Sequence, residues 1–264
     1  MKPRLGILVA VIVCSIASVA GAADWPMYLA NPERGSVTAE ALTFPLKQAW
    51  VRTVKHPPRP AWPPPANVPN LQEVVHFDRA FQPVVAGGLL YFGSSVDDTV
   101  YCIDAATSKP KWSFTTEGPI RLAPVIADGR AFVASDDGNL YCLDAKTGAV
   151  KWSYRIGPED RRIAGNGRMI SAWPVRSGVI VKDGIVHAAA GIFPTYGVYL
   201  CGVRVEDGKE IWKTKMKVPA QGYMIEWNDW LFVPTGRTSP RIYDRRTGKL
   251  VKPVPGYRNL GARI

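Results

Sequence analysis

The sequence has few of the residues from which enzymes build reaction centres. Histidine occurs three times in 264 residues, and His56, His76 and His187 are scattered along the chain. There is no Gly-x-Ser-x-Gly elbow, no His-Glu-x-x-His helix and no glycine-rich phosphate loop. The sequence therefore carries no recognisable catalytic constellation. His187 falls within a predicted strand, where we expect a packed or hydrogen-bonded side chain and not a general base.

Long apolar runs are missing after residue 22, so no later segment is expected to cross a membrane. The run Leu5–Val13 is too short to span a bilayer, follows Lys2 and Arg4, and precedes a small-residue cleavage site that ends at Ala22. This pattern predicts a signal peptide over residues 1–22 and an exported protein of the periplasm or cell envelope. A retained N-terminal anchor is the alternative.

Acidic residues are scarce relative to basic ones. The chain has 33 Lys and Arg against 22 Asp and Glu, a formal net charge of +11. Such a surface attracts anionic polymers, lipid headgroups or acidic proteins in a salt-dependent way, which allows peripheral association with a membrane. General solubility explains the charge equally well. We expect no nucleic acid partner for an exported chain.

A repeated motif is the strongest signal in the sequence. It occurs at Tyr101–Trp112 and Tyr141–Trp152, more loosely at Val203–Trp212, and without its final tryptophan at Ile242–Val251. Self-similarity at a period near 40 residues is typical of repeat architectures.

One repeat, read from residue 124 to residue 154, contains four short apolar segments. They are residues 124–127, 131–134, 140–143 and 150–154, and turn residues such as Asp128-Gly129 separate them. Four such strands form one antiparallel blade, and blades arranged radially form a propeller. We predict an all-β propeller with about four blades in this chain, as part of a larger ring.

The motif residues have structural roles in this interpretation. Asp144 accepts hydrogen bonds within its own turn, and Gly148 supplies a left-handed conformation. Trp152 packs against the neighbouring blade, where removal of such a ring costs about 3–5 kcal/mol. The complete set of predicted structural residues is Trp50, Asp104, Trp112, Asp144, Gly148, Trp152, Gly208, Trp212, Asp244 and Gly248.

The Asp-x-x-Thr-Gly turn with its trailing tryptophan resembles the tryptophan-docking repeat of the PQQ-type β-propellers. The opening Asp24-Trp25-Pro26-Met27-Tyr28 is similar to the entry segment of secreted propellers of this kind. The family includes quinoprotein alcohol dehydrogenases and the BamB-like lipoprotein of the outer-membrane assembly machinery. The resemblance covers roughly residues 45–255 and implies the fold more than the function, because the shared residues hold blades together.

Three cysteines follow the predicted leader. Cys102 and Cys142 occupy the same place in consecutive repeats, which we expect to lie beyond the ~7 Å limit for a disulfide. Together with Cys201 they are predicted to be buried thiols that act as small apolar residues. Their spacing matches no zinc or haem pattern.

Trp50 does not fit the repeat pattern of the other tryptophans. It looks like the tryptophan of the last strand of a blade whose other strands are missing. We divide the chain into a leader (1–22), an entry segment (23–45) and blades (46–264). Three arrangements stay open: an N-terminal portion of a longer propeller, partial rings from two or more chains that complete one another, or an open or four-bladed arc. Open blade edges invite self-association.

Two insertions interrupt the repeat, and loops at such places often carry function. The proline-rich insertion 55–75 either forms a stiff arm that covers one mouth of the ring or docks on a partner, or it is a connector that packs Trp62 on the blade surface. The insertion 157–177 is rich in arginine, which suits carboxylates, phosphates and sulfates. A third irregularity spans 191–197 in the same blade. The predicted ligand-binding candidates are Arg161, Arg162, Arg168, Trp173, Arg176, Phe193 and Tyr196; alternatively the arginines of this loop pair with Glu159 and Asp160 or point into water.

The sequence leaves three functions open. The first is an exported, non-catalytic propeller that binds an envelope protein or an anionic or carbohydrate polymer through its insertion loops. The second, implied by the resemblance, is a dehydrogenase of alcohols or sugars that uses PQQ and calcium; the chain lacks the adjacent cysteine pair that the alcohol dehydrogenases of that family typically carry. The third is a sensor or accessory part of a larger multidomain protein. We expect the first, without a cofactor or a metal.

Overall fold

The computed structural model describes residues 23–62, 78–236 and 239–251. Strands and loops make up this described part of the chain, which contains no helix. The predicted leader 1–22, most of the proline-rich insertion and all residues after Val251 lie outside the described residues.

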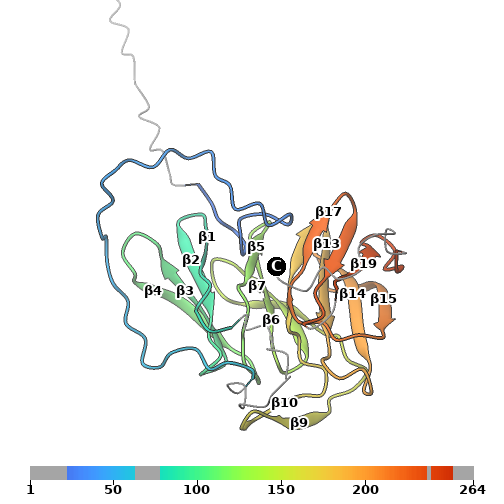
Figure 1. The fold of residues 1–264 in the computed structure, drawn as a ribbon. Coiled ribbons are helices and arrows are strands. Elements are labelled where there is room, and N and C mark those ends of the chain that lie inside the picture. Colours follow the sequence, from blue (N-terminus) through green and yellow to red (C-terminus); the bar gives the residue numbers. More distant parts are fainter. Residues whose placement is uncertain (1–22, 63–77, 237–238, 252–264) are drawn as a thin grey trace, which may run out of the picture.

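The strands form a fan of antiparallel blades that follow one another along the chain (Figure 1). Each of the first three blades is a four-stranded sheet in sequential order. Blade 1 consists of β1 (Val84–Ala86), β2 (Leu89–Gly93), β3 (Thr99–Asp104) and β4 (Pro110–Thr115); blade 2 of β5 (Val125–Ala127), β6 (Arg130–Ala134), β7 (Asn139–Asp144) and β8 (Val150–Arg155); and blade 3 of β12 (Ile180–Lys182), β13 (Ile185–Ala190), β14 (Val198–Arg204) and β15 (Glu210–Met216). The predicted all-β propeller fold is confirmed, and the four strands of blade 2 coincide with the four apolar segments of its repeat.

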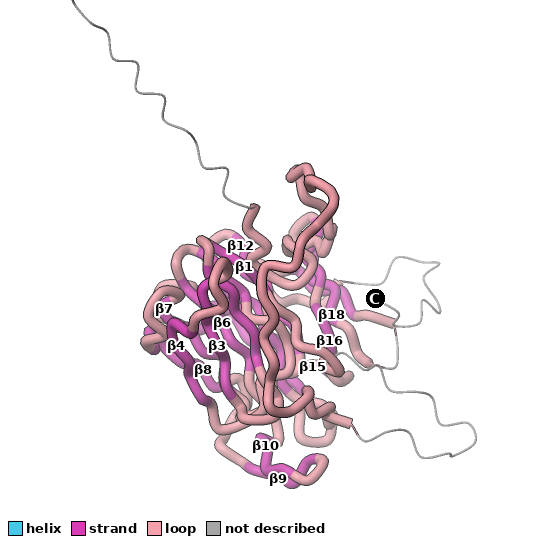
Figure 2. Tube along the Cα trace, turned by 90° about the vertical axis from the view of Figure 1, so that its left-hand side faces the viewer, coloured by secondary structure: helices cyan, strands magenta, loops and turns pink. Residues whose placement is uncertain are grey.

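The fourth blade has three strands, namely β17 (Ile225–Trp227), β18 (Trp230–Val233) and β19 (Arg241–Asp244). A single bridge from Tyr243 to Leu250 marks the beginning of a fourth strand. Blades 3 and 4 are joined near the axis by a short parallel pair, β11 (Ser177–Gly178) with β16 (Gly222–Tyr223). The hairpin of β9 (Arg162–Gly165) and β10 (Arg168–Ser171) projects from one end of the fan, as Figure 2 shows.

Tryptophans join each blade to the next. The indole N–H of Trp112 donates to the carbonyl of Ala145 at 2.9 Å, that of Trp152 to Val205 at 2.9 Å, and that of Trp212 to Arg245 at 3.1 Å. In every case the accepting carbonyl belongs to the second residue of the motif turn in the next blade. The same geometry recurs because the same turn recurs.

A glycine lets each ring approach its turn. A Cβ on Gly148 would lie 2.7 Å from the ring of Trp112, and one on Gly208 would lie 2.7 Å from the ring of Trp152. Both glycines have positive φ, 75° and 70°, which other residues rarely adopt. The turn aspartate accepts local hydrogen bonds as well: Oδ1 of Asp144 takes the amide and the hydroxyl of Thr147 at 3.0 Å.

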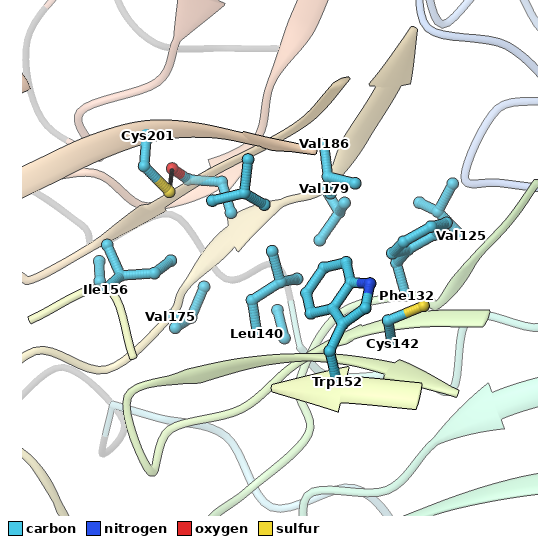
Figure 3. Packing of buried hydrophobic residues seen from close by; sticks show 14 of the residues in the cluster. Val125, Phe132, Leu140, Cys142, Trp152, Ile156, Val175, Val179, Val186 and Cys201 are labelled. Atoms are coloured by element: carbon cyan, nitrogen blue, oxygen red, sulfur yellow. Dashed lines mark hydrogen bonds between the residues drawn. The ribbon is translucent and has the colours of Figure 1, made fainter. Parts of the chain in front are cut away.

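The apolar core lies between blades. Figure 3 shows the indole of Trp152 between Phe132 and Cys142 of blade 2 and Val179 and Val186 on the side of blade 3. All five side chains are buried. The thiols of the three described cysteines are free and buried, as their spacing predicted; the full set is Cys102, Cys142 and Cys201.

The entry segment crosses the inner strands of all four blades. Trp25 pairs with Val85 of blade 1, and the carbonyl of Pro26 accepts the amide of Ile126 in blade 2 at 2.8 Å. The guanidinium of Arg34 donates to carbonyls of Tyr28, Val179 and Met224. Burial lowers the pKa of Arg34 to about 10, and it remains a cation at neutral pH. Backbone and side-chain hydrogen bonds therefore tie the N-terminal segment to the axis.

The segment that follows makes few contacts with the blades. Every residue from 35 to 57 is exposed except Trp50, which is half-buried. Figure 1 shows this segment as an arc outside blade 1. The indole N–H of Trp50 donates to the carbonyl of Ala105 at 2.9 Å. We call residues Leu46–Val54 the outer segment.

Candidate functional site

A fully buried carboxylate organises one end of the axis. Both oxygens of Asp136 accept from Arg176, Oδ1 from Nε at 3.0 Å and Oδ2 from Nη2 at 2.8 Å, and Oδ2 also accepts Nε of Arg121 at 2.6 Å. Nη1 of Arg121 reaches Asp78 at 2.8 Å. Burial alone would raise the pKa of Asp136, but the charges of Arg176 and Arg121 outweigh it and hold the pKa below the usual value.

Three polar residues around this end come from equivalent places in the fold. Arg121, Arg176 and Gln221 each stand four residues before the innermost strand of their blade. Because the repeat brings these positions to the same end of the axis, the residues meet although they are far apart in the sequence. We call this end the mouth.

Asp136 differs in its role from the aspartates that resemble it in the sequence. Read as letters alone, the pairs Asp97-Asp98 and Asp136-Asp137 look like equivalent turns in consecutive repeats. In the structure Asp97 corresponds to Asp137, because each accepts a hydrogen bond from the tyrosine four residues later. Asp136 is instead buried among arginines. An acidic residue two positions after the apolar strand β6, together with arginines at matching places in two blades, was the signal for it.

The proline-rich insertion covers the mouth. The amide of Ala61 donates to Oδ2 of Asp78 at 2.7 Å, and the carbonyl of Arg59 accepts Nη1 of Arg121 at 2.9 Å. The indole N–H of Trp62 donates to Oε1 of Gln221 at 3.0 Å, and the guanidinium of Arg176 lies 5.7 Å from the centre of the Trp62 ring. The described part of this insertion therefore packs over the buried ion pairs.

A cavity of about 190 Å³ lies beneath this cover. Trp62 and Arg176 line it together with residues of the β9–β10 hairpin and of the loop 191–197. The lining residues are Ala61, Trp62, Ile163, Ala164, Gly165, Asn166, Ile170, Arg176, Ile192 and Phe193. The second insertion and the third irregularity, which lie in the same blade, thus share one mouth.

Arg168 fastens the hairpin to blade 1. Its Nη1 donates to the carbonyls of Ser95 at 2.7 Å and Val96 at 3.0 Å, and its Nη2 pairs with Asp98. Burial raises the pKa of Asp98, although Arg168 opposes the effect. Across the hairpin tip, the side-chain amide of Asn166 donates to the carbonyl of Pro60 at 3.0 Å.

The other two arginines of the hairpin are nearer the solvent. Arg162 pairs with Glu117 and, at 3.3 Å, with Asp160. The exposed Arg161 lies with its guanidinium 4.8 Å from the ring centre of Tyr196. Among the described residues Arg161 forms no ion pair.

The aromatic candidates also divide into a buried residue and two exposed ones. Trp173 is buried in the core and donates to the carbonyl of Tyr196 at 3.0 Å. Phe193 and Tyr196 are exposed, with ring centres 6.1 Å apart and an edge-to-face angle of 81°. The structure thus separates the seven predicted candidates: Arg176, Arg168 and Trp173 support the mouth, Arg162 forms surface ion pairs, and Arg161, Phe193 and Tyr196 face outward.

The described residues do not fit a calcium-bound quinone. None of them forms a group of three or more His, Cys, Asp or Glu that could hold a metal ion. The buried carboxylate of Asp136 is already engaged by two arginines, and Asp78 accepts Arg121 and the amide of Ala61. Next to the residue that bonds to the Arg176 carbonyl, the ring of Tyr223 stacks on that of Tyr28, with ring centres 3.8 Å apart. We therefore derive no reaction step through this cofactor. The part of the chain that the structure describes also has no helix long and apolar enough to cross a membrane.

Comparisons with known proteins identify related β-propellers. A family profile described as outer membrane protein assembly factor BamB matches residues 47–235. A search of curated protein sequences found no match. Among solved structures, quinohemoprotein alcohol dehydrogenase from Comamonas testosteroni is similar with a TM-score of 0.57 and 17% identity, over 87% of this chain and 40% of that chain.

Two further structures are similar at low identity. Quinohemoprotein alcohol dehydrogenase ADHIIG from Pseudomonas putida HK5 has a TM-score of 0.54 and 17% identity, over 65% of this chain and 33% of that chain. BamB from Moraxella catarrhalis has a TM-score of 0.35 and 14% identity, over 63% of this chain and 60% of that chain. The chain therefore spans a third to two fifths of the length of the two dehydrogenases. At these identities the likeness concerns the fold.

Proposed function

Since this chain belongs to the BamB-like family of PQQ-repeat β-propellers, we propose that it is an exported, non-catalytic binding module that presents its mouth loops to an envelope protein. An anionic or carbohydrate polymer is the other partner that the same surface suits. The observation that carries the proposal is an exposed aromatic and basic surface beside a mouth whose buried charges are already paired. We call this surface the rim patch and define it as Arg161, Met169, Phe193 and Tyr196.

The side chains of the rim patch are more exposed than apolar groups of a packed domain usually are. Met169 is 58% exposed, Phe193 37% and Tyr196 38%. Aromatic residues, methionine and arginine are the types enriched in protein interfaces. Arg161 lies on Tyr196 with its charge unpaired among the described residues, and a planar guanidinium suits a carboxylate, phosphate or sulfate of a partner.

The support beneath the rim patch favours binding as well. Arg168 fastens the hairpin to blade 1, Trp173 holds the loop of Tyr196 from the core, and Asn166 bonds to the proline-rich cover. A surface held by such contacts loses little conformational freedom when a partner docks. The net positive charge of the chain adds attraction to acidic partners.

The described residues favour no reaction. The charged groups at the mouth neutralise one another, and the buried His187 has no second titratable group arranged as an acid-base pair with it among the described residues. The dehydrogenase alternative is supported by the likeness of fold to the two quinohemoprotein alcohol dehydrogenases and by no ligand set among the described residues. A role as a sensor or accessory part of a larger protein is compatible with the proposal, because the rim patch would serve there in the same way.

Site-specific photo-crosslinking tests the proposal. A photoreactive phenylalanine analogue replaces Phe193 in the exported protein, and the same analogue replaces the exposed Trp227 as a control. We expect one dominant adduct with an envelope component from position 193 and none from position 227. The adduct should weaken at high salt and in the double variant Arg161→Ala/Tyr196→Ala. Equal labelling from both positions, or no adduct from position 193, would rule the rim patch out.

A further inference from the structure

The cavity at the mouth is a pocket with one open and one buried end. Its volume is about 190 Å³. Ala164, Asn166 and Phe193 line it and are exposed, whereas Ile170 and Arg176 line it and are buried. The lining therefore runs from the solvent beside the β9–β10 hairpin inward to the guanidinium of Arg176.

The side chains around this pocket are mainly apolar. Among the lining residues, Trp62, Asn166 and Arg176 have side chains that form hydrogen bonds. The indole N–H of Trp62 already donates to Gln221, and the side-chain amide of Asn166 donates to the carbonyl of Pro60. A water molecule here finds few partners and is easily displaced, because a buried water usually makes about three hydrogen bonds. The pocket therefore favours a ligand that is largely apolar.

Arg176 has one donor to spare at the buried end. Its Nε and Nη2, which form one edge of the planar guanidinium, both donate to Asp136. Nη1 lies on the other side and donates no hydrogen bond to a described residue. The side chain is only 2% exposed, and Trp62 lies against it. Burial of an unpaired donor costs free energy, so a ligand that brings an acceptor to Nη1 gains affinity.

The charge at the open end favours an anionic acceptor. The exposed guanidinium of Arg59 donates to the carbonyl of Asn166, a lining residue, at 3.3 Å. Arg59 forms no ion pair with a described residue. Because its charge has no counter-charge there, it attracts an anion toward the entrance, as the net charge of +11 does for the chain as a whole. A carboxylate is the anion that a guanidinium matches best on an otherwise apolar ligand.

We propose that this pocket binds a small free monocarboxylate with a compact apolar body, such as a single aromatic ring. The carboxylate accepts Nη1 of Arg176, and the apolar body packs against Trp62, Ile170 and Ile192. An apolar cavity of about 150 Å³ holds a benzene molecule, so the volume of this pocket suits one ring and its carboxylate. The proposal goes beyond the binding of an envelope protein, and the two surfaces share one residue, Phe193.

Titration of the whole chain with phenylacetate, followed by NMR of labelled isoleucine methyl groups, tests the proposal. We expect saturable shifts at Ile170 and Ile192, which line the pocket, with a dissociation constant of about 1 mM or lower. Ile103, buried in blade 1, should not shift. The neutral analogue 2-phenylethanol, which keeps the ring, should bind about tenfold more weakly. The absence of saturable shifts, or equal affinities for the two compounds, overturns the proposal.

Two neighbouring rings give a matched pair of variants. Phe193 and Tyr196 lie in the same loop and are 37% and 38% exposed, but of the two only Phe193 lines the pocket. Phe193→Ala should weaken phenylacetate binding about tenfold, and Tyr196→Ala should leave it unchanged. Because Tyr196 belongs to the rim patch and not to the pocket, the pair also separates this site from the protein-binding surface. Any result other than a selective loss in Phe193→Ala contradicts the assigned pocket.

Arg176→Lys tests the contact with the carboxylate. The variant keeps a cation beside Asp136 but removes the free nitrogen. Phenylacetate should bind about tenfold more weakly, whereas 2-phenylethanol should lose less than about threefold. The methyl spectrum without ligand shows whether the variant keeps its fold, and the result for Phe193→Ala does not depend on it. Equal losses for the two compounds in a folded variant contradict the contact.

A short peptide distinguishes a free ligand from the end of a protein chain. Acetyl-glycyl-phenylalanine carries the same ring and a carboxylate, but on a peptide backbone. We expect it to bind more weakly than phenylacetate, because the pocket has room for one ring and its carboxylate. Tighter binding of the peptide would assign the pocket to a protein C-terminus and overturn its assignment to a small free ligand.

Discussion

Trp152 and Trp50 donate the same hydrogen bond at the same length, 2.9 Å, in very different surroundings. Trp152 stands on β8, within a four-stranded sheet, and its ring packs against Gly208 of the next blade. Trp50 stands on a segment without a sheet, and its turn carries Ser108 where the other turns carry glycine. The hydrogen bond is therefore a property of the turn, whereas burial of the ring requires the rest of the blade.

The difference separates a packed centre from an open end. In the centre, the buried carboxylate of Asp136 is paired with two arginines, and the indole of Trp152 donates to a turn of the next blade. At the open end, the apolar side chains of the outer segment are exposed to solvent. The predictions below compare positions of the two kinds, or positions that differ in one contact.

Removal of the buried carboxylate at the centre should have the largest effect. Asp136→Ala leaves the guanidiniums of Arg121 and Arg176 buried without their shared counter-charge. We expect a loss of about 3–5 kcal/mol in the free energy of unfolding, measured by urea denaturation. Asp97→Ala, at a turn near the surface, should cost less than about 1 kcal/mol. Similar losses in the two variants would show that the centre is no more stabilising than the edge.

The two tryptophans themselves give the direct test of the comparison. Trp152→Ala should lower the free energy of unfolding by about 3–5 kcal/mol because it empties a packed site between blades. Trp50→Ala should cost less than about 1 kcal/mol, because its ring is only half-buried. Equal losses in the two variants would mean that the outer segment is already part of a complete blade.

The joint between blades 3 and 4 should respond to pH. Tyr91, Phe132 and His187 occupy the same place in blades 1, 2 and 3, two residues into a β2-type strand. Nε2 of His187 lies 2.9 Å from the carbonyl of Arg245, the same carbonyl that accepts Trp212. Burial lowers the pKa of His187 to about 4.

The sign of the effect follows from linkage. Between the unfolded pKa near 6.5 and the folded value of about 4, the unfolded chain binds a proton that the folded chain does not. This contribution to stability is complete above pH ~6.5 and is lost as the pH falls toward 4, by up to about 3 kcal/mol. His187→Phe, which copies Phe132, should flatten the pH dependence of unfolding in that window. An unchanged slope in this variant would assign the effect to another group.

A methyl group on the docking glycine should cost less than loss of the ring. Gly148→Ala places a Cβ 2.7 Å from Trp112 at a φ of 75°. We expect a loss of about 1–3 kcal/mol in thermal or urea unfolding. The reverse change at the open end, Ser108→Gly, should alter stability by less than about 1 kcal/mol, since the ring of Trp50 is only half-buried there. A neutral Gly148→Ala would contradict the close approach of ring and turn.

The smallest effect is expected at the surface of the β9–β10 hairpin. Arg162→Ala removes exposed ion pairs with Glu117 and Asp160 and should cost about 0.5 kcal/mol or less. Arg168→Ala removes two hydrogen bonds to backbone carbonyls and the partner of Asp98, so we expect about 1–3 kcal/mol. The rate of proteolytic cleavage in the hairpin should rank the two variants in the same order, with faster cleavage in Arg168→Ala. Equal protection would mean that Arg168 does not fasten the hairpin.

Much of the fold could be predicted because it depends on local chemistry. The strands of blade 2, the turn at Asp128-Gly129 and the place of the three cysteines all follow from short patterns of apolar and turn residues. The link between Trp50 and blade 1 could be expected as well, because the motif that accepts it recurs at Asp104. The mouth was harder to predict, because Asp136 lies in a turn-rich stretch and its partners Arg121 and Arg176 come from segments distant in the sequence.

The candidate site shows the same limit. The motif and loop lengths indicated which segments would meet, and the structure brings the β9–β10 hairpin, the loop 191–197 and the described end of the proline-rich insertion around one cavity. The residue type alone did not predict the contacts that each arginine makes. Arg176 is buried against a carboxylate, Arg168 bonds to backbone carbonyls, and Arg161 lies on an exposed ring, since each direction depends on strands from other blades.

Repetition in the amino-acid order was enough to specify the blade, its turns and the tryptophan that joins one blade to the next, because the same short motif of turn residues and tryptophan recurs in successive repeats. The partners of Asp136, the cover of Trp62 over the mouth and the exposed position of the outer segment were decided only when the blades came together. Those contacts join residues from different repeats, and no short pattern records which side chains the arrangement of blades will bury.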